Sequence, residues 1–319
     1  CLMVVMLHSA APYLYQYGDI PTSEWMFANI LDSFTRACVP IFFMISGYLF
    51  FSSRSGPRSR HLVRLVSATL FYSSVGLLYR FSAGSDITWK SVVAIFYSPS
   101  FYHLWFFYAL LPVYLLMMVV RLRGAEPWRL MPVLVLILVL NPSSTDILPF
   151  LGMNYSVSGP GFLDSNLLAY FLYALLGVLI GGLDEKHFSR ISLAASLAIY
   201  SAASVLIATF TYLETSQAGA FIGKFYEYAN AFVVVQAISL FVVFRHCSFH
   251  LAGLSLISAL SLPVYGIHAF LLEKPGSLGL LAQGFPASAV ILMSFVAAVS
   301  VSLALGLIIR RADRAGLVH

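Results

Sequence analysis

The stretch CLMVVMLH, residues 1–8, decides the class of this protein, because it sets a histidine inside a continuous apolar run. We interpret the run as part of a helix that crosses a membrane. An ionisable side chain is costly inside a lipid bilayer, so a histidine in such a helix is a functional-site hypothesis by default. His8 is therefore the first candidate for chemistry. The alternative is a histidine that only makes a hydrogen bond within a helix bundle.

The composition of the whole chain indicates the same class. Of its 319 residues, 60% are hydrophobic and 10% are charged, whereas soluble domains carry about 25% charged residues. A water-soluble core could not enclose so much apolar surface. We predict an all-α polytopic membrane protein that forms one domain over residues 1–319. The net charge of +5 does not indicate nucleic acid binding, since the basic residues lie in short loops between apolar segments.

Apolar segments long enough to cross a bilayer recur along the chain, which predicts about ten transmembrane helices in one bundle. We expect these helices near residues 1–17, 33–51, 65–82, 102–120, 129–141, 166–182, 191–213, 227–244, 255–272 and 286–309. Because the chain starts inside an apolar run, we expect its first helix to lack about a dozen residues of the 20 or so that a span needs.

The basic residues alternate between the two sides of this arrangement. One set of loops and helix ends holds thirteen of the 18 lysines and arginines: Arg54, Arg58, Arg60, Arg64, Arg121, Arg123, Arg129, Lys186, Arg190, Arg245, Arg310, Arg311 and Arg314. Cytoplasmic loops carry an excess of basic residues. The bias therefore predicts that both termini are cytoplasmic.

The three cysteines do not indicate a cross-link or a metal centre. Cys1, Cys38 and Cys247 lie far apart in the sequence and lack the CxxC spacing. Neither a disulfide framework nor a zinc site follows from such a pattern. We predict no metal site.

Arg36 is a cation at the outer end of an expected helix, four residues after Asp32. Side chains four residues apart on a helix face each other, so a structural ion pair explains both residues. The functional alternative is a cation directed into a cavity, where it holds an anionic group or polarises an oxygen. The sequence leaves both interpretations open.

Two more histidines lie at a similar expected depth. His103 stands in FYHLWFF, residues 101–107, and His268 ends PVYGIH, residues 263–268. An ordinary interfacial belt explains the tyrosine and the tryptophan beside His103, but it does not explain the histidine. Tyr265 and His268 are three residues apart and share one helix face.

Four polar side chains from four separate segments are thus expected at compatible depths: His8, Arg36, His103 and His268. A single such residue needs no special explanation, but four predict one shared cavity. We predict that these four residues carry the chemistry. Glu273 falls on the same side of the membrane, where it is equally well explained as a solvated loop acid.

A basic cluster faces the predicted cytoplasmic side: Arg54, Arg58, Arg60, His61 and Arg64. Charge that only fixes the membrane topology explains this cluster. The functional alternative is the docking of a phosphate-rich donor, which arginine suits through its planar array of donors. We place Arg64 among the residues that bind substrate on this second interpretation.

The polar residues and their apolar neighbours resemble the membrane acyltransferase 3 family. The likeness lies in VVMLH at 4–8, in Arg36 followed by VPIFFMISGY at 39–48, in HLWF at 103–106 and in YGIH at 265–268. The order and spacing of these motifs extend along almost the whole chain. The family hallmark is an arginine followed eleven residues later by a histidine in the first helix, and His8 matches that histidine.

The resemblance implies an enzyme of the bacterial inner membrane that transfers an acyl group to a surface carbohydrate. The donor is acetyl-CoA at the cytoplasmic side, used as a substrate, with no tightly bound cofactor. The acceptor is a hydroxyl of an N-acetylglucosamine residue in a lipid-linked or polymeric glycan, and membrane lipid surrounds the protein. We expect Trp105 and Tyr265 to contact substrate.

The expected roles follow from the chemistry of each side chain. His8 acts either as the general base toward the sugar hydroxyl or as a transient acyl carrier. Arg36, His103 and His268 orient the acceptor or stabilise the developing oxyanion. Two rival classes stay open: a transporter or flippase of a glycolipid, and a structural membrane partner whose polar residues would not converge.

Overall fold

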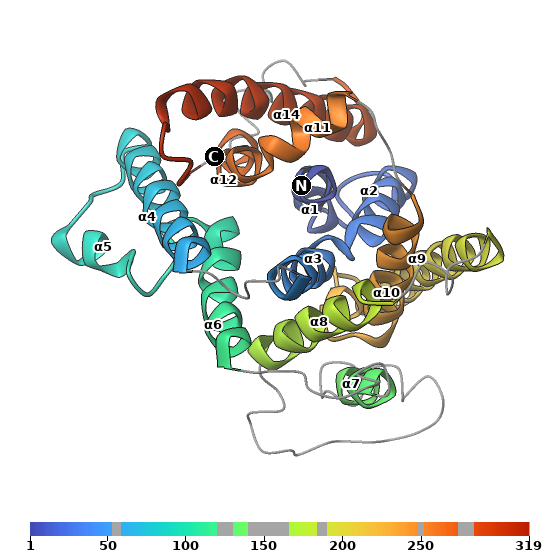
Figure 1. The fold of residues 1–319 in the computed structure, drawn as a ribbon. Helices are drawn as coiled ribbons and strands as arrows, with labels where there is room; N and C mark the ends of the chain where they lie inside the picture. The colour runs from blue at the N-terminus through green and yellow to red at the C-terminus, as the bar shows by residue number, and fades with distance from the viewer. Residues whose placement is uncertain are drawn as a thin grey trace. The chain divides into compact units, whose positions relative to one another are not determined.

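A computed structural model of the chain describes residues 1–52, 59–119, 130–139, 166–183, 190–247, 252–273 and 284–318. Every regular element within these ranges is a helix, which confirms the all-α prediction (Figure 1). The chain divides into two compact units, which are described separately. Unit 1 comprises Cys1–Ser9, Arg58–Leu115 and His250–His319, and unit 2 comprises Ala10–Pro57 and Leu116–Phe249. The single domain over residues 1–319 stays a prediction.

Six of the described helical segments are long and apolar enough to cross a membrane: Thr22–Phe50, Arg60–Ser82, Tyr102–Val119, Ser192–Ala218, Lys224–His246 and Ala287–Ala312. A seventh candidate is a broken pair, Gly253–Ala259 and Ser261–Leu272, bent by 79°. The chain is therefore a polytopic membrane protein. The expected total of about ten transmembrane helices, and the cytoplasmic position of both termini, stay predictions.

Unit 1 is built around a short helix that carries His268. Its elements are the start of α1 (Leu2–Leu14), α4 (Ser59–Ser82), α5 (Trp89–Ala94), the 3-10 turn η1 (Tyr102–Leu104), α6 (Trp105–Val119), α11 (Ala252–Ala259), α12 (Ser261–Leu272) and α14 (Ala287–Ala312). Helix α12 packs against α14 (Figure 1). It also packs against α4 and η1. The segment expected as one helix at 255–272 is thus two helices, α11 and α12, with the break at Leu260.

A small apolar core joins the start of α1 to this central helix. Val5, Leu260, Val264 and Ala298 are buried against one another. They come from α1, the break before α12, α12 itself and α14. This packing fixes α1 beside α12 and so sets the position of His8, which follows Val5 by three residues along the same helix.

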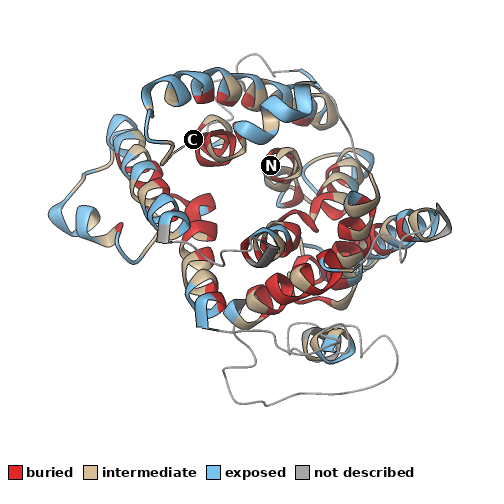
Figure 2. Ribbon diagram, in the orientation of Figure 1, coloured by how far each residue is buried: buried red, intermediate tan, exposed pale blue. Residues whose placement is uncertain are grey.

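Helix α14 presents large aliphatic side chains outward. Leu292, Val296 and Ile308 are all exposed, and Figure 2 shows the outer side of α14 in the exposed colour. Such an apolar surface is unfavourable in water and is what a lipid-facing helix requires. The surface agrees with a membrane-embedded α14.

Unit 2 contains the remainder of the described helices: α2 (Thr22–Thr35), α3 (Cys38–Ser52), α7 (Met131–Val139), α8 (Asn166–Gly181), α9 (Arg190–Ala218), the 3-10 turn η5 (Lys224–Tyr226) and α10 (Ala231–His246). Helix α3 packs along α8, and α10 packs along α9 (Figure 1). Figure 2 shows α8 largely in the buried colour. Helix α8 therefore lies in the interior of the unit.

Glycines allow α3 and α8 to approach at backbone distance. A Cβ atom at Gly47 of α3 would collide with the carbonyl of Ala174, and one at Gly177 of α8 would collide with the carbonyl of Met44. Helix α8 carries the spacing GVLIG at 177–181. Small residues four apart create such close contacts in membranes, where van der Waals packing drives helix association.

Helix α2 was not expected as a separate element, since the second predicted segment was 33–51. Its inner face is polar, which is why an apolar pattern did not reveal it. The Asn29 amide donates to the Ala208 carbonyl at 2.9 Å, and the Gln236 amide donates to the Ser33 carbonyl at 2.8 Å. In a low-dielectric interior these satisfied contacts bind α2 to its neighbours α9 and α10.

Candidate functional site

Two histidines form the centre of the candidate site in unit 1. His8 Nδ1, from α1, lies 2.8 Å from His268 Nε2, from α12. The two ring planes differ by only 14°, and the ring centres are 5.0 Å apart. The distance between the ring centres exceeds the distance between the two nitrogens by roughly two ring radii. The rings therefore meet edge to edge along a well-aligned hydrogen bond.

The backbone of α12 fixes the tautomer of this pair. His268 Nδ1 lies 2.8 Å from the Tyr265 carbonyl and 3.0 Å from the Val264 carbonyl. Carbonyl oxygens only accept hydrogen bonds, so Nδ1 of His268 carries the hydrogen and its Nε2 carries the lone pair. His8 Nδ1 must then donate to that lone pair. A neutral His8 therefore has its own lone pair on Nε2.

His103 is fully buried beside this pair and is tied to the same helix. Its Nε2 lies 3.2 Å from the Gly266 carbonyl, to which it donates. In return, the Tyr265 hydroxyl donates to the His103 carbonyl. These two reciprocal bonds bind η1 to α12. Within the described residues, His103 Nδ1 has no hydrogen-bond partner.

Aromatic rings surround the three histidines. The Tyr102 ring stands edge-on to His8 with centres 5.4 Å apart, and the His103 ring stands edge-on to His268 at 5.3 Å. The structure thus brings His8, His103 and His268 together from α1, η1 and α12. Their catalytic roles stay predictions.

The residues expected to bind substrate occupy different places in unit 1. Tyr265 is buried and its hydroxyl bonds the backbone of His103. Trp105 is half-buried at the start of α6, with its ring edge-on to Phe106. Arg64 is exposed on α4. Their contacts with substrate stay predictions.

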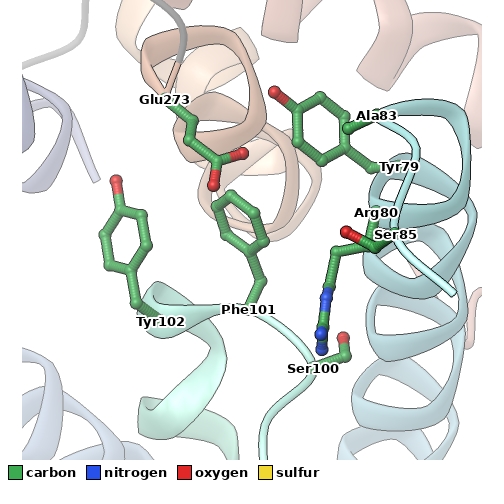
Figure 3. Close-up of a pocket in the computed structure, with 8 residues that line it drawn as sticks. All are labelled: Tyr79, Arg80, Ala83, Ser85, Ser100, Phe101, Tyr102 and Glu273. Carbon is green, nitrogen blue, oxygen red and sulfur yellow. The ribbon is translucent and has the colours of Figure 1, made fainter. Parts of the chain in front are cut away.

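A cavity of about 320 Å³ opens beside Tyr102 in unit 1. Figure 3 shows its lining, which comes from the ends of three elements: Tyr79 and Arg80 from α4, Ser100, Phe101 and Tyr102 at the start of η1, and Glu273 after α12. Sequence reasoning missed this cavity, because Glu273 was interpreted equally well as a solvated loop acid. Only the folded positions of α4 and α12 reveal that Tyr79 and Glu273 share one space.

Arg36 belongs to unit 2, at the end of α2. Its Nε donates to the Asp32 carboxylate, and its guanidinium lies 4.1 Å from the centre of the Tyr226 ring. The Asp32 side chain is fully buried, and its second oxygen has no hydrogen-bond partner within the described residues. The expected pairing four residues apart is therefore present.

Arg36 also lines a cavity of about 600 Å³ in unit 2. Besides Arg36, this cavity is lined by Tyr15, Phe221, Lys224, Glu227 and Tyr228. Both interpretations of Arg36 thus have a structural basis, because the residue makes an ion pair and also borders a space. The convergence of Arg36 with the three histidines stays a prediction.

In the part of the chain that the structure describes, no group of three or more histidine, cysteine, aspartate or glutamate side chains is arranged to hold a metal ion. The three histidines are instead connected by the hydrogen bond between His8 and His268 and by the backbone carbonyls of α12.

A comparison with known proteins identifies the family of the chain. Residues 1–309 match the acyltransferase domain that defines the acyltransferase 3 family. Neither a search of curated proteins nor a search of solved structures finds a match. The match covers nearly the whole chain, including the three clustered histidines and Arg36. The chain therefore belongs to the acyltransferase 3 family and is a membrane acyltransferase.

Proposed function

We propose that the protein is an O-acetyltransferase of the bacterial inner membrane. It moves an acetyl group from cytoplasmic acetyl-CoA to a hydroxyl of a surface glycan, which we propose to be N-acetylglucosamine of enterobacterial common antigen. The family match supports acyl transfer. The likeness of the sequence motifs supports the choice of donor and acceptor.

The observation that carries the proposal is the hydrogen bond between His8 Nδ1 and His268 Nε2. It gives His8 a defined tautomer with its lone pair on Nε2. A positioned imidazole lone pair is the usual general base near neutral pH. The same lone pair would also be the nucleophile if His8 carried the acyl group transiently.

The proposed transfer balances without any further reactant. The acceptor hydroxyl loses its proton to His8 Nε2 while its oxygen bonds to the acetyl carbon of the thioester. The carbon–sulfur bond then breaks, and the proton passes from Nε2 to the departing sulfur. While His8 is protonated, its Nδ1–H bond to His268 becomes charge-assisted and therefore stronger.

The other predicted residues receive roles that fit their positions. His103 and Tyr265 hold η1 against α12 and so position the histidine pair. Arg64, exposed on α4, is proposed to hold the phosphates of the donor. Arg36 is proposed to contact substrate through the cavity of its own unit.

The test is the transfer of isotope from labelled acetyl-CoA to glycan by membranes that contain the full-length protein. The variant His8→Ala should lose transfer while it still inserts in the membrane, and His246→Ala serves as the matched control. Full transfer by His8→Ala would remove His8 from the mechanism. Movement of a glycolipid without any transfer of label would instead support the transporter alternative.

A further inference from the structure

The cavity beside Tyr102 has the composition of a sugar-binding site. Three aromatic rings line it, those of Tyr79, Phe101 and Tyr102, together with the carboxylate of Glu273 and the guanidinium of Arg80. A sugar ring has an apolar C–H face that packs on aromatic rings and a rim of hydroxyl groups that needs polar partners. Ligand sites in general combine an apolar lining with a few placed polar groups.

The charges of the lining indicate a neutral ligand. The lining residues include one base, Arg80, and one acid, Glu273. A site for a phosphate would be expected to gather cations, because charge-assisted hydrogen bonds to anionic oxygens are stronger than neutral ones. A balanced pair instead provides one acceptor group and one donor group for hydroxyls.

The polar groups face into the space. Figure 3 shows the Glu273 carboxylate directed between the rings of Tyr79 and Tyr102, and the Arg80 guanidinium directed toward Ser100. Glu273 also interacts electrostatically with both tyrosines. A hydroxyl-bearing ring placed there would therefore meet a carboxylate and two phenol groups.

The walls of the cavity are held by packing, so the site is formed before a ligand arrives. Phe101 packs on Phe270 with ring centres 4.6 Å apart and on Tyr79 at 5.6 Å. The Ser100 hydroxyl donates to the Ser73 carbonyl at 2.8 Å, which ties the loop before η1 to α4. A preformed site saves the cost of ordering these side chains on binding.

The cavity adjoins the proposed catalytic histidine. Tyr102 lines the cavity and also contacts the His8 ring. Glu273 follows His268 by five residues, just past the end of the same helix. Tyr102 therefore borders both the cavity and the His8 ring, so a ring bound in the cavity lies within one side chain of His8.

We propose that this cavity is the acceptor subsite and that it binds one neutral sugar ring. Glu273 and the Tyr79 hydroxyl make hydrogen bonds with ring hydroxyls. The rings of Tyr79 and Phe101 pack on the sugar, and Tyr102 guides one hydroxyl to His8. This assignment rests on the proposed acyl transfer. It adds the residues that select a neutral carbohydrate.

The experiment compares acceptor kinetics in membranes that contain the full-length protein. The probe is a neutral alkyl glycoside of N-acetylglucosamine, with acetyl-CoA at saturation. Glu273→Gln keeps the shape and removes the charge, while Tyr79→Phe keeps the ring and removes the hydroxyl. We expect each variant to raise the acceptor KM by about tenfold or more, which is the effect of losing one hydrogen bond to a charged or buried group, while kcat falls by less than threefold.

The controls are Asp19→Asn and Tyr97→Phe, which make the same chemical changes outside this cavity and should keep the acceptor KM of the unmodified protein. If the unmodified protein transfers acetyl groups but both cavity variants keep an unchanged acceptor KM, the subsite assignment is wrong and the proposed function stands. If the unmodified protein transfers no acetyl group to any glycan, the proposed function itself fails. Insertion of both variants, measured in the same membranes, separates a binding effect from misfolding.

Discussion

His8 Nδ1 and His268 Nε2 are joined by a 2.8 Å hydrogen bond between α1 and α12. The two residues are 260 positions apart in the chain, so the contact exists only in the folded unit. Because two carbonyls of α12 hold the hydrogen on His268 Nδ1, the direction of this bond is fixed. The first prediction follows from that direction.

Removing the His268 imidazole, which accepts the hydrogen bond from His8 Nδ1, should leave the tautomer of His8 undefined. We expect His268→Ala to lower kcat on the order of 100-fold, since positioned acid–base groups contribute at least that much. His268→Gln should recover part of the loss, because its side-chain oxygen can accept from His8 Nδ1. Steady-state kinetics across pH would check both variants. Equal activity in His268→Ala and the unmodified protein would contradict a positioning role.

A variant of Tyr265 tests whether its hydroxyl only holds the His103 backbone or also binds substrate. We expect Tyr265→Phe to lower the free energy of unfolding by about 1 kcal/mol, the usual value of one hydrogen bond. It should leave the acceptor KM close to that of the unmodified protein. Thermal unfolding in detergent and acceptor kinetics measure the two effects. A large rise in KM with unchanged stability would show that the Tyr265 hydroxyl binds substrate directly.

Variants of the ion pair between Arg36 and Asp32 distinguish a structural role of Arg36 from a role in binding substrate. We expect Arg36→Ala to destabilise the protein by about 3–5 kcal/mol, because it leaves a buried carboxylate unpaired. The double variant Asp32→Asn with Arg36→Gln replaces the pair by neutral polar side chains and should fold, because no buried charge is left unpaired.

Activity of that double variant is the measurement that matters. If Arg36 contacts substrate, the double variant is stable and inactive. If it is only a structural partner of Asp32, the double variant is stable and active. Unfolding curves and acetyl transfer, measured on one preparation, distinguish these outcomes.

The glycine contact between α3 and α8 predicts a stability effect without a direct effect on the site. Gly177→Val places a side chain against the Met44 carbonyl, and backbone atoms cannot move aside as a flexible side chain can. We expect a loss of about 2 kcal/mol, typical of overpacking. Gly253→Ala in α11 is the control, since a Cβ atom there meets open space. Size-exclusion profiles after heating would show whether Gly177→Val is less stable than this control.

The donor role of Arg64 is testable with two thioesters. Arg64→Gln should raise the KM for acetyl-CoA several-fold, because it removes one charge-assisted contact to a phosphate. It should not change the KM for a short acetyl thioester that lacks the nucleotide phosphates. An equal KM for acetyl-CoA in the variant and the unmodified protein would mean that Arg64 does not bind the donor and only helps to fix the membrane topology.

The helical architecture could be predicted from the sequence because lipid imposes a simple pattern. Long apolar segments such as Ala287–Ala312 are visible without any structure, and every predicted segment overlaps a described helix. The three histidines could also be selected, since a polar side chain stands out in an apolar run. Helix α2 could not be predicted, because its Asn29 and Asp32 face inward and give it a mixed pattern.

The finer features of the site depend on contacts between distant segments. The tautomer of His8 is set by carbonyls of α12, which no residue type reveals. Glu273 and Tyr79 are separated by almost two hundred positions, and only the packing of α12 on α4 brings both to one cavity. The bend at Leu260, by contrast, has a local cause in the sequence. Pro263 has no backbone N–H to donate to the Ala259 carbonyl, and its ring clashes with that carbonyl, so one continuous helix cannot pass through this point.

The carbonyl contacts of His268 have a further consequence for an enzyme surrounded by lipid. Many hydrolases orient their histidine with a carboxylate, which would add a permanent negative charge to a region where charge is poorly solvated. Here the orienting groups are peptide dipoles from one helical turn. The resting pair can therefore remain electrically neutral, and a charge arises only for the brief time that a proton is in transit.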